Sequence, residues 1–176
     1  MKFQHLSAYT AHNALGCYKE PAGNQQAAAK HLIANSNRHA RQLATSPLNW
    51  KESWTYYHSV YLPSVSYSLP VSHIPPTTLA EIQAPAIGTF LPKCGYNRNM
   101  LRVVVFGPQE YGGMGFRQLN VEQGAGQIDY FLKFWRTDCE AGSLLRIALS
   151  WSQVMAGVSW PILQNVICKC DYVIVT

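Results

Sequence analysis

Leu48–Pro70, which reads LNWKESWTYYHSVYLPSVSYSLP, is the stretch that decides the fold. It opens with Asn49 and, three residues later, Glu52, which is the spacing of a capping box at the start of a helix. Pro63 is expected to end or bend this helix, and either a short strand or an irregular helical turn fits Ser64–Pro70. Aromatic and apolar residues recur every three or four positions, and we interpret this stripe as core: Trp50, Ser53 or Trp54, Tyr57, and Val60 or Tyr61.

Four further helices are predicted outward from this stretch. One begins at Asn24 and runs to about Ala44, with a basic outer side, and another opens at Pro75, bends at Pro85 and closes at Gly95. The last two follow capping patterns over residues 120–123 and 137–140, and the final helix ends just before Gly157. Their expected buried residues are, in chain order, Leu32, Ser36, His39 or Ala40, and Leu43; Leu79, Ile82, Ala86, Ile87 and Phe90; Val121, Ala125, Ile128, Leu132 and Trp135; and Leu144, Leu145, Ala148, Trp151, Ser152 and Met155.

A small β element is predicted over residues 101–117. The β-branched run Val103–Phe106 is followed by a glycine-rich turn at residues 112–115, which favours a hairpin. A further short strand is plausible at Leu15–Tyr18. The expected fold class is therefore mainly α, with about five helices and a small β-hairpin near 101–117, as one compact unit or two closely packed lobes.

The bulk composition indicates a folded domain with a basic balance. The 176 residues are 48% hydrophobic and 13% charged, which is typical of a globular chain, and the net charge of +5 favours an anionic partner. The N-terminus lacks the apolar core of a signal peptide, and no apolar run approaches the roughly 18 residues that span a bilayer. We expect an intracellular protein, nuclear or cytoplasmic and not secreted, with no membrane partner.

The acidic and sulfur-bearing residues do not form a recognisable catalytic or metal site. Polymerase chemistry needs aspartates converging on two metal ions, whereas Asp129, Asp138 and Asp171 are all separated in the sequence. The spacing of Cys168 and Cys170 is too tight for a zinc site, and the glycines at 112–115 lack the Lys-Ser/Thr of a phosphate loop. We expect no catalytic residue, no metal and no cofactor, and hence a chain that is not itself an enzyme.

The basic residues gather where acidic residues are missing. No acid occurs between Glu20 and Glu52, nor between Glu81 and Glu110. In the second gap the turn at residues 94–99 places an aromatic ring among cations, an arrangement that suits a phosphate backbone with bases to stack on. The alternative interpretation is a solvated face of isolated cations. The basic residues of the two gaps include Lys30, Arg38 and Arg41 in the first, and Lys93, Arg98 and Arg102 in the second.

Five blocks of the sequence also carry a resemblance to a known family. They read AHNALGCYKEPAGNQ (Ala11–Gln25), the stretch quoted above, GYNRNM with VVFGP, YGGMGFRQL with EQGAGQIDYFLKFWR, and LLRIALSWSQVMAG. In this order they resemble the region C-terminal to the reverse-transcriptase domain in one group of eukaryotic retrotransposon polyproteins. The resemblance implies that residues 1–23 are the end of the polymerase palm, residues 24–163 a helical thumb- or connection-like domain, and residues 164–176 a divergent tail without an assigned function.

The resemblance implies a non-catalytic fragment of a retrotransposon reverse transcriptase that holds the template–primer nucleic acid, an RNA–DNA hybrid or a DNA duplex. The catalytic part of a full-length element is a further expected partner. Two alternatives stay open: an inert, truncated retroelement remnant, and a helical protein–protein interaction module around Trp54 and Tyr57. The expected nucleic-acid contacts are Arg38, Arg41, Lys93, Tyr96, Asn97, Arg98, Arg102 and Arg117.

Overall fold

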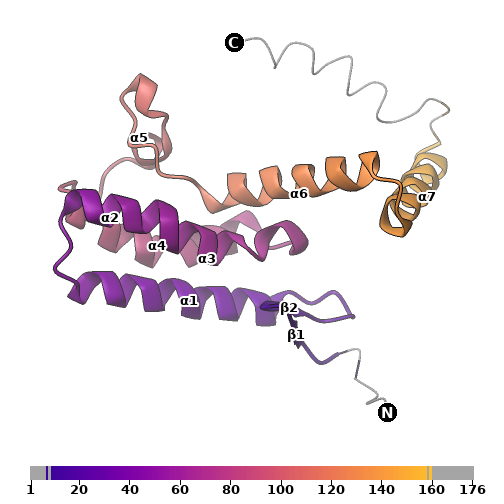
Figure 1. Cartoon of the computed structure of the whole chain (residues 1–176), viewed down its shortest axis with the longest axis horizontal. Coiled ribbons are helices and arrows are strands. Elements are labelled where there is room, and N and C mark those ends of the chain that lie inside the picture. The colour runs from indigo at the N-terminus through magenta and orange to yellow at the C-terminus, as the bar shows by residue number, and fades with distance from the viewer. Residues whose placement is uncertain (1–6, 8, 158, 160–176) are drawn as a thin grey trace. The chain divides into compact units, whose positions relative to one another are not determined.

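The computed structural model describes Ser7, residues 9–157 and Ser159, and most of these residues are helical (Figure 1). The predicted mainly α class is confirmed, and the five long helices are α1, the continuous run α2–η1–α3, α4, α6 and α7. The elements are β1 (His12–Ala14), β2 (Cys17–Lys19), α1 (Gln26–Thr45), α2 (Trp50–Tyr56), the π-helical η1 (Tyr57–Tyr61), α3 (Leu62–Ser66), the 3₁₀ turn η2 (Leu69–Val71), α4 (Pro76–Lys93), α5 (Arg102–Phe106), the 3₁₀ turn η3 (Gln109–Tyr111), α6 (Leu119–Arg136) and α7 (Glu140–Met155).

The chain divides into two units, residues 1–127 and residues 128–176. The boundary falls within α6, and therefore inside the range 24–163 that the resemblance implies to be one helical domain. The expected tail, residues 164–176, lies outside the described residues.

The run α2–η1–α3 begins at the predicted capping box. The Asn49 side chain accepts the Glu52 N–H at 3.0 Å, and the Glu52 carboxylate accepts the Asn49 N–H at 2.9 Å. The helix continues through Pro63 to Ser66, because the π-helical turn just before the proline leaves room for a residue that has no N–H to donate. Of the two structures proposed for Ser64–Pro70, the irregular helical turn is the observed one.

Helices α1 and α4 pack against this run and enclose an aromatic core. The Tyr57 ring lies 4.9 Å from Phe90 and 4.7 Å from Phe116, measured between ring centroids, and all three side chains are buried. The predicted inward residues of α1 and α4 are all buried, so both of these stripes are confirmed. Helix α4 continues through Pro85 and ends at Lys93. Gly95 (φ 82°) follows two residues later, as the predicted glycine at the helix C-terminus.

The predicted β-hairpin at residues 101–117 is wrong, because the valine run forms the short helix α5. Val104 and Val105 both donate their N–H groups to Leu101 O, and Val105 is fully buried, so core packing overrides β propensity. Residues 114–116 return along α5 and donate to carbonyl groups of residues 104, 105 and 107. The hairpin lies instead at β1–β2, where His12 pairs with Lys19 and Ala14 with Cys17.

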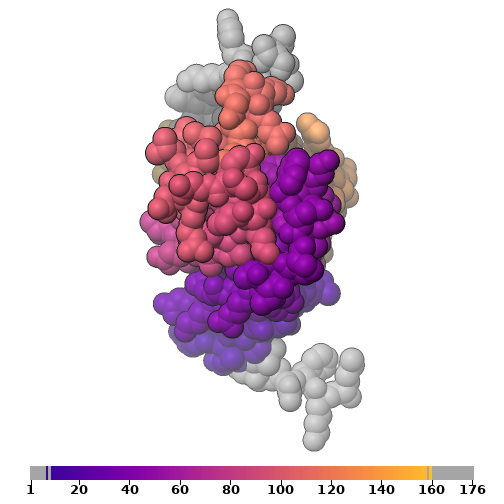
Figure 2. All heavy atoms as spheres, turned by 90° about the vertical axis from the view of Figure 1, so that its left-hand side faces the viewer, coloured from indigo at the N-terminus to yellow at the C-terminus, as the bar shows by residue number. Residues whose placement is uncertain are grey.

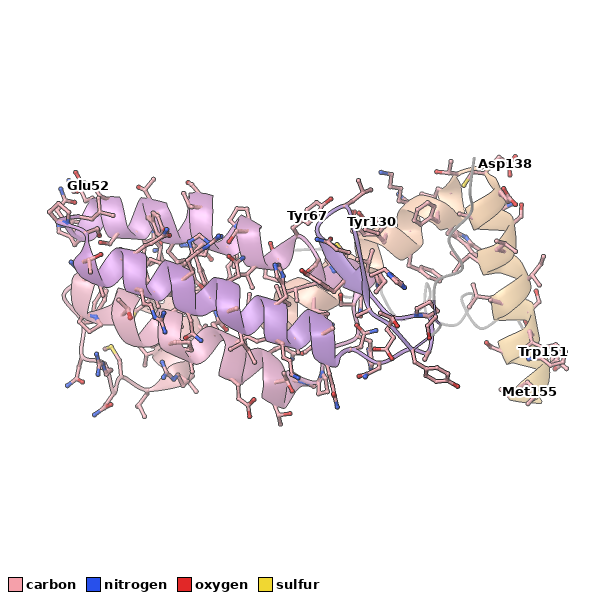
Figure 3. All side chains as sticks on the ribbon, turned by 90° about the horizontal axis from the view of Figure 1, so that it is seen from below. Glu52, Tyr67, Tyr130, Asp138, Trp151 and Met155 are labelled. Atoms are coloured by element: carbon pink, nitrogen blue, oxygen red, sulfur yellow. The ribbon has the colours of Figure 1, made fainter. Side chains whose placement is uncertain are left out.

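The buried stripes predicted for α6 and α7 are also wrong. On α6 the buried residues are Leu119 and Gln123, both near its start, and Ile128 is 62% exposed. On α7 the buried residue is Gly142, while Trp151 and Met155 project from the last turns of the helix (Figure 3). Both helices have the predicted periodicity. Within the described chain, however, too few elements pack on these helices to bury their apolar faces. Six other residues expected inside are exposed: Val121, Ala125, Leu132, Leu144, Ala148 and Ser152.

Candidate nucleic-acid interface

Three helix termini meet at one end of the first unit. The Lys93 ammonium donates to Ser46 O at 2.7 Å, and the Cys94 thiol lies 3.9 Å from Trp50 O. These contacts join the C-terminal ends of α1 and α4 to the start of α2. Figure 2 looks onto this end, where the segment after α4 lies beside the start of α2.

Four of the eight expected contact residues lie together in and after the last turn of α4. Lys93 is half-buried and held by Ser46, so its first role is to satisfy a carbonyl at the end of α1. Tyr96 is 44% exposed, and the Asn97 side chain accepts the Asn99 N–H at 2.8 Å, which stabilises the turn. Arg98 is exposed and donates from Nε to Gly88 O at 3.1 Å, so its guanidinium is anchored to α4.

The other expected contacts are spread over the first unit. Arg102 is exposed at the first position of α5, beside an apolar cavity of about 380 Å³ between α4, α5 and the segment that leads into α6. Arg38 donates to Asn35 at 2.7 Å, and Arg41 is exposed on the same helix. Arg117 forms an ion pair with Glu122 at 3.4 Å. Within the described chain, no hydrogen bond or ion pair joins these residues to the turn after α4.

An aromatic pocket of about 270 Å³ opens beside this turn. Its lining comes from the start of α2, the end of α4, the turn that follows, and the loop around residues 109–114. Tyr96 is the one lining residue that the sequence nominates as a contact. We call this site the aromatic pocket; it is lined by Trp50, Trp54, Cys94, Tyr96, Gln109, Gly113 and Met114.

The two tryptophans of this pocket are not among the contacts expected from the sequence, because their spacing assigns them to the core. Trp50 is 59% exposed, because it is the first residue of α2 and lies beyond the packed part of the helix. Its place directly after the helix cap Asn49 is the signal that could have found it. Trp54 is half-buried, and its ring rests on Phe116 at 5.0 Å and on His58 at 4.5 Å.

A buried hydrogen-bond network fixes the segment that enters α6. The Tyr57 hydroxyl donates to Arg117 O at 2.8 Å, and the Gln83 amide donates to the same oxygen at 2.7 Å. The Gln83 side-chain oxygen accepts the Leu119 N–H at 3.2 Å. Burial raises the pKa of the Tyr57 hydroxyl well above its ordinary value, so this group remains a donor. The network therefore sets the backbone from which Arg117 projects.

His39 is a structural residue and not a ligand of the site. Its ring nitrogens lie 2.8 Å from the Tyr56 hydroxyl and 3.0 Å from the Ser64 hydroxyl. Burial, aided by the charge of Arg38, lowers the pKa of His39, which keeps the ring neutral near pH 7. In the part of the chain that the structure describes, no three His, Cys, Asp or Glu side chains gather as a metal site.

The positive charge of the chain is concentrated in the first unit. Residues 9–127 carry nine Lys or Arg and five Glu, whereas residues 128–157 carry three basic and three acidic residues. In the second unit Arg146 also forms an ion pair with Asp138 at 3.2 Å. The electrostatic attraction for an anion therefore belongs to the first unit.

Comparison of the chain with protein families, curated protein sequences and solved structures finds no match. None of the helices in the described ranges is long and apolar enough to cross a membrane.

Proposed function

We propose that this chain is a nucleic-acid-binding, non-catalytic segment of a retrotransposon reverse transcriptase, the thumb- or connection-like part that holds the template–primer duplex. In this proposal the chain contributes cations and rings but no polymerase metal ligands. The catalytic part of a full-length element would act beside it. The sequence resemblance supports the family, and the basic, aromatic end of the first unit supports the ligand.

The observation that carries the proposal is the arrangement of Arg98. Its Nε is tied to Gly88 O, and among the described residues its two terminal nitrogens donate to no protein group. A guanidinium held in this way is pre-oriented, and its free N–H groups match the two oxygens of a phosphate. Arg102 lies four residues further along the chain and is also exposed. Each phosphate that such a cation neutralises releases a counterion, which favours binding at low salt.

The alternative of a protein–protein interaction module around Trp54 and Tyr57 has less support. Tyr57 is fully buried in the core, and Trp54 is half-buried, so the pair does not form an exposed aromatic patch. The inert remnant is the outcome to expect if the folded chain has no affinity for nucleic acid.

The proposal is tested by fluorescence anisotropy with a labelled RNA–DNA hybrid and the full chain, at low and moderate salt. We expect micromolar or tighter binding that the double variant Arg98→Ala, Arg102→Ala weakens, with a log–log salt slope shallower by about two because two phosphate contacts are lost. The matched control is Lys133→Ala with Arg136→Ala, which removes the same charge from the second unit and should leave binding near the wild-type value. A chain that is folded by circular dichroism but does not bind at low salt would overturn the proposal.

A further inference from the structure

We propose that the aromatic pocket holds one unpaired nucleobase from a single-stranded stretch next to the duplex. This inference rests on the proposed function and adds a ligand for a site that binding to phosphates does not use. Its basis is a concave surface of three aromatic side chains, of which two are exposed.

The three rings of the pocket differ in how they are packed. The Trp54 ring packs against the rings of His58 and Phe116. Among residues 9–157, no other aromatic ring packs on Trp50 or Tyr96, and these side chains are 59% and 44% exposed. Rings that the core does not use can stack on a base, because every base offers a flat π-face.

The charges around the pocket favour a base with its phosphate over a cation. Aromatic pockets that select ammonium groups attract the positive charge of their ligand, but here the Lys51 ammonium lies 5.5 Å from the centroid of the Trp50 ring. Lys93 precedes the lining residue Cys94, and no lining residue carries a charge, since burial raises the pKa of the Cys94 thiol and keeps it neutral. A second cation would be repelled, whereas a neutral ring attached to a phosphate would be attracted.

Size and polarity agree with a single base. The pocket volume of about 270 Å³ lies just below the range of roughly 300–1,000 Å³ that takes drug-sized ligands, so one flat ring system suits it. The Gln109 amide, which donates to Met114 O through a long bond of 3.4 Å, is the lining group that can pair with the polar edge of a base. A base inside a duplex has both faces stacked and cannot enter, so the ligand must be unpaired.

The test compares two labelled RNA–DNA hybrids with the full chain by anisotropy, one blunt and one with a short single-stranded overhang. We expect the overhang to tighten binding by about 5- to 150-fold, the effect of stacking one base on aromatic side chains. Trp50→Ala and Tyr96→Ala should each remove most of this gain, whereas Tyr96→Phe, which retains the ring, should keep it. Trp50 is not among the expected duplex contacts, so Trp50→Ala should also leave the affinity for the blunt hybrid unchanged. The control is Tyr111→Ala, which removes an exposed aromatic side chain that does not line the pocket.

The outcomes separate this inference from the proposed function. Equal affinity for both hybrids, or an overhang gain that survives Trp50→Ala and Tyr96→Ala together, would overturn the base-binding pocket while leaving duplex binding intact. An overhang without bases, made of abasic nucleotides, should give no gain if stacking is the cause. A gain of equal size with that overhang would assign the effect to phosphates and contradict the inference.

Discussion

Leu15 has the backbone conformation that is most costly for its residue type in the described chain. It is the first central residue of the β1–β2 turn, with φ 51°, and Gly16 follows with φ 80°, so both have the positive φ of a type I′ turn. A left-handed conformation costs an L-residue about 1–2 kcal/mol, and asparagine tolerates it better than leucine. The Leu15 side chain is 90% exposed, so it contributes little burial in return.

We therefore expect Leu15→Asn to raise the free energy of unfolding by about 0.5–1 kcal/mol. Urea denaturation followed by circular dichroism measures the change. Ala14→Asn, at an exposed strand position without positive φ, should give no gain. A lower stability for Leu15→Asn would mean that the contacts of the leucine side chain stabilise the fold by more than its positive φ costs.

His39 links the stability of the first unit to pH. Its pKa in the folded chain is lowered from 6.5, chiefly by burial, so the unfolded chain takes up a proton more readily than the folded one. The free energy of unfolding should therefore be retained above about pH 6.5 and should fall as the pH drops below that value. His58 shifts in the same direction, again chiefly through burial, and adds to the effect.

Denaturation curves between neutral and mildly acidic pH test this linkage. His39→Asn should reduce the pH dependence of stability, although it also lowers stability at neutral pH because the bonds to Tyr56 and Ser64 are altered. His73→Asn, at an exposed site, should keep the wild-type dependence. An unchanged dependence in His39→Asn would show that other groups control it.

At Gly126, helix α6 packs closely on Pro70 within the first unit. A Cβ added there would lie 2.6 Å from Pro70 Cγ, while a Cβ at Gly124 would meet no atom within 4 Å. Both glycines lie in the same helix, where alanine is favoured over glycine by about 1 kcal/mol. Gly124→Ala should therefore stabilise the chain by up to that amount, whereas Gly126→Ala should destabilise it by about 1–3 kcal/mol, because the rigid proline ring cannot move aside easily.

Thermal unfolding of the two alanine variants measures the difference. The expected order of stability is Gly124→Ala, wild type, Gly126→Ala. Equal stabilisation by both substitutions would contradict the close packing of α6 on η2.

Elements with a strong local signal could be predicted from the sequence, and elements decided by tertiary packing could not. Three features follow from residue spacing: the capping box at Asn49, the buried faces of α1 and α4, and the glycine that follows α4. Residues 101–117 were misassigned because the backbone bonds that hold α5 come from residues 114–116, a pairing that β propensity does not encode. The periodicity of residues in α6 and α7 correctly predicts two helices. It does not indicate whether another element packs on their apolar faces.

The candidate site was only partly predictable for a related reason. The cluster of Lys93, Tyr96, Asn97 and Arg98 is contiguous in the sequence, so its proximity follows directly. The aromatic pocket joins residues more than forty positions apart, since Trp50 and Tyr96 both line it where α2 lies beside the end of α4. Such a site depends on tertiary packing and cannot be predicted from local sequence patterns.

The two units of the chain differ in their balance of charge. The excess of basic residues lies within residues 9–127, together with Arg98, Arg102 and the aromatic pocket, whereas the described part of the second unit is balanced. Binding of nucleic acid should therefore depend on the first unit and weaken with salt, since attraction to a phosphate backbone is electrostatic in origin.

The most direct test of this claim is the dissociation constant of the wild-type chain for an RNA–DNA hybrid, measured by anisotropy over a series of salt concentrations. We predict a linear fall of log affinity with log salt, with a slope of about −2 or steeper, because in the proposed complex Arg98 and Arg102 would each neutralise one phosphate and contribute about −0.9. An affinity that does not change with salt, or no binding at the lowest salt by a folded chain, would contradict the account.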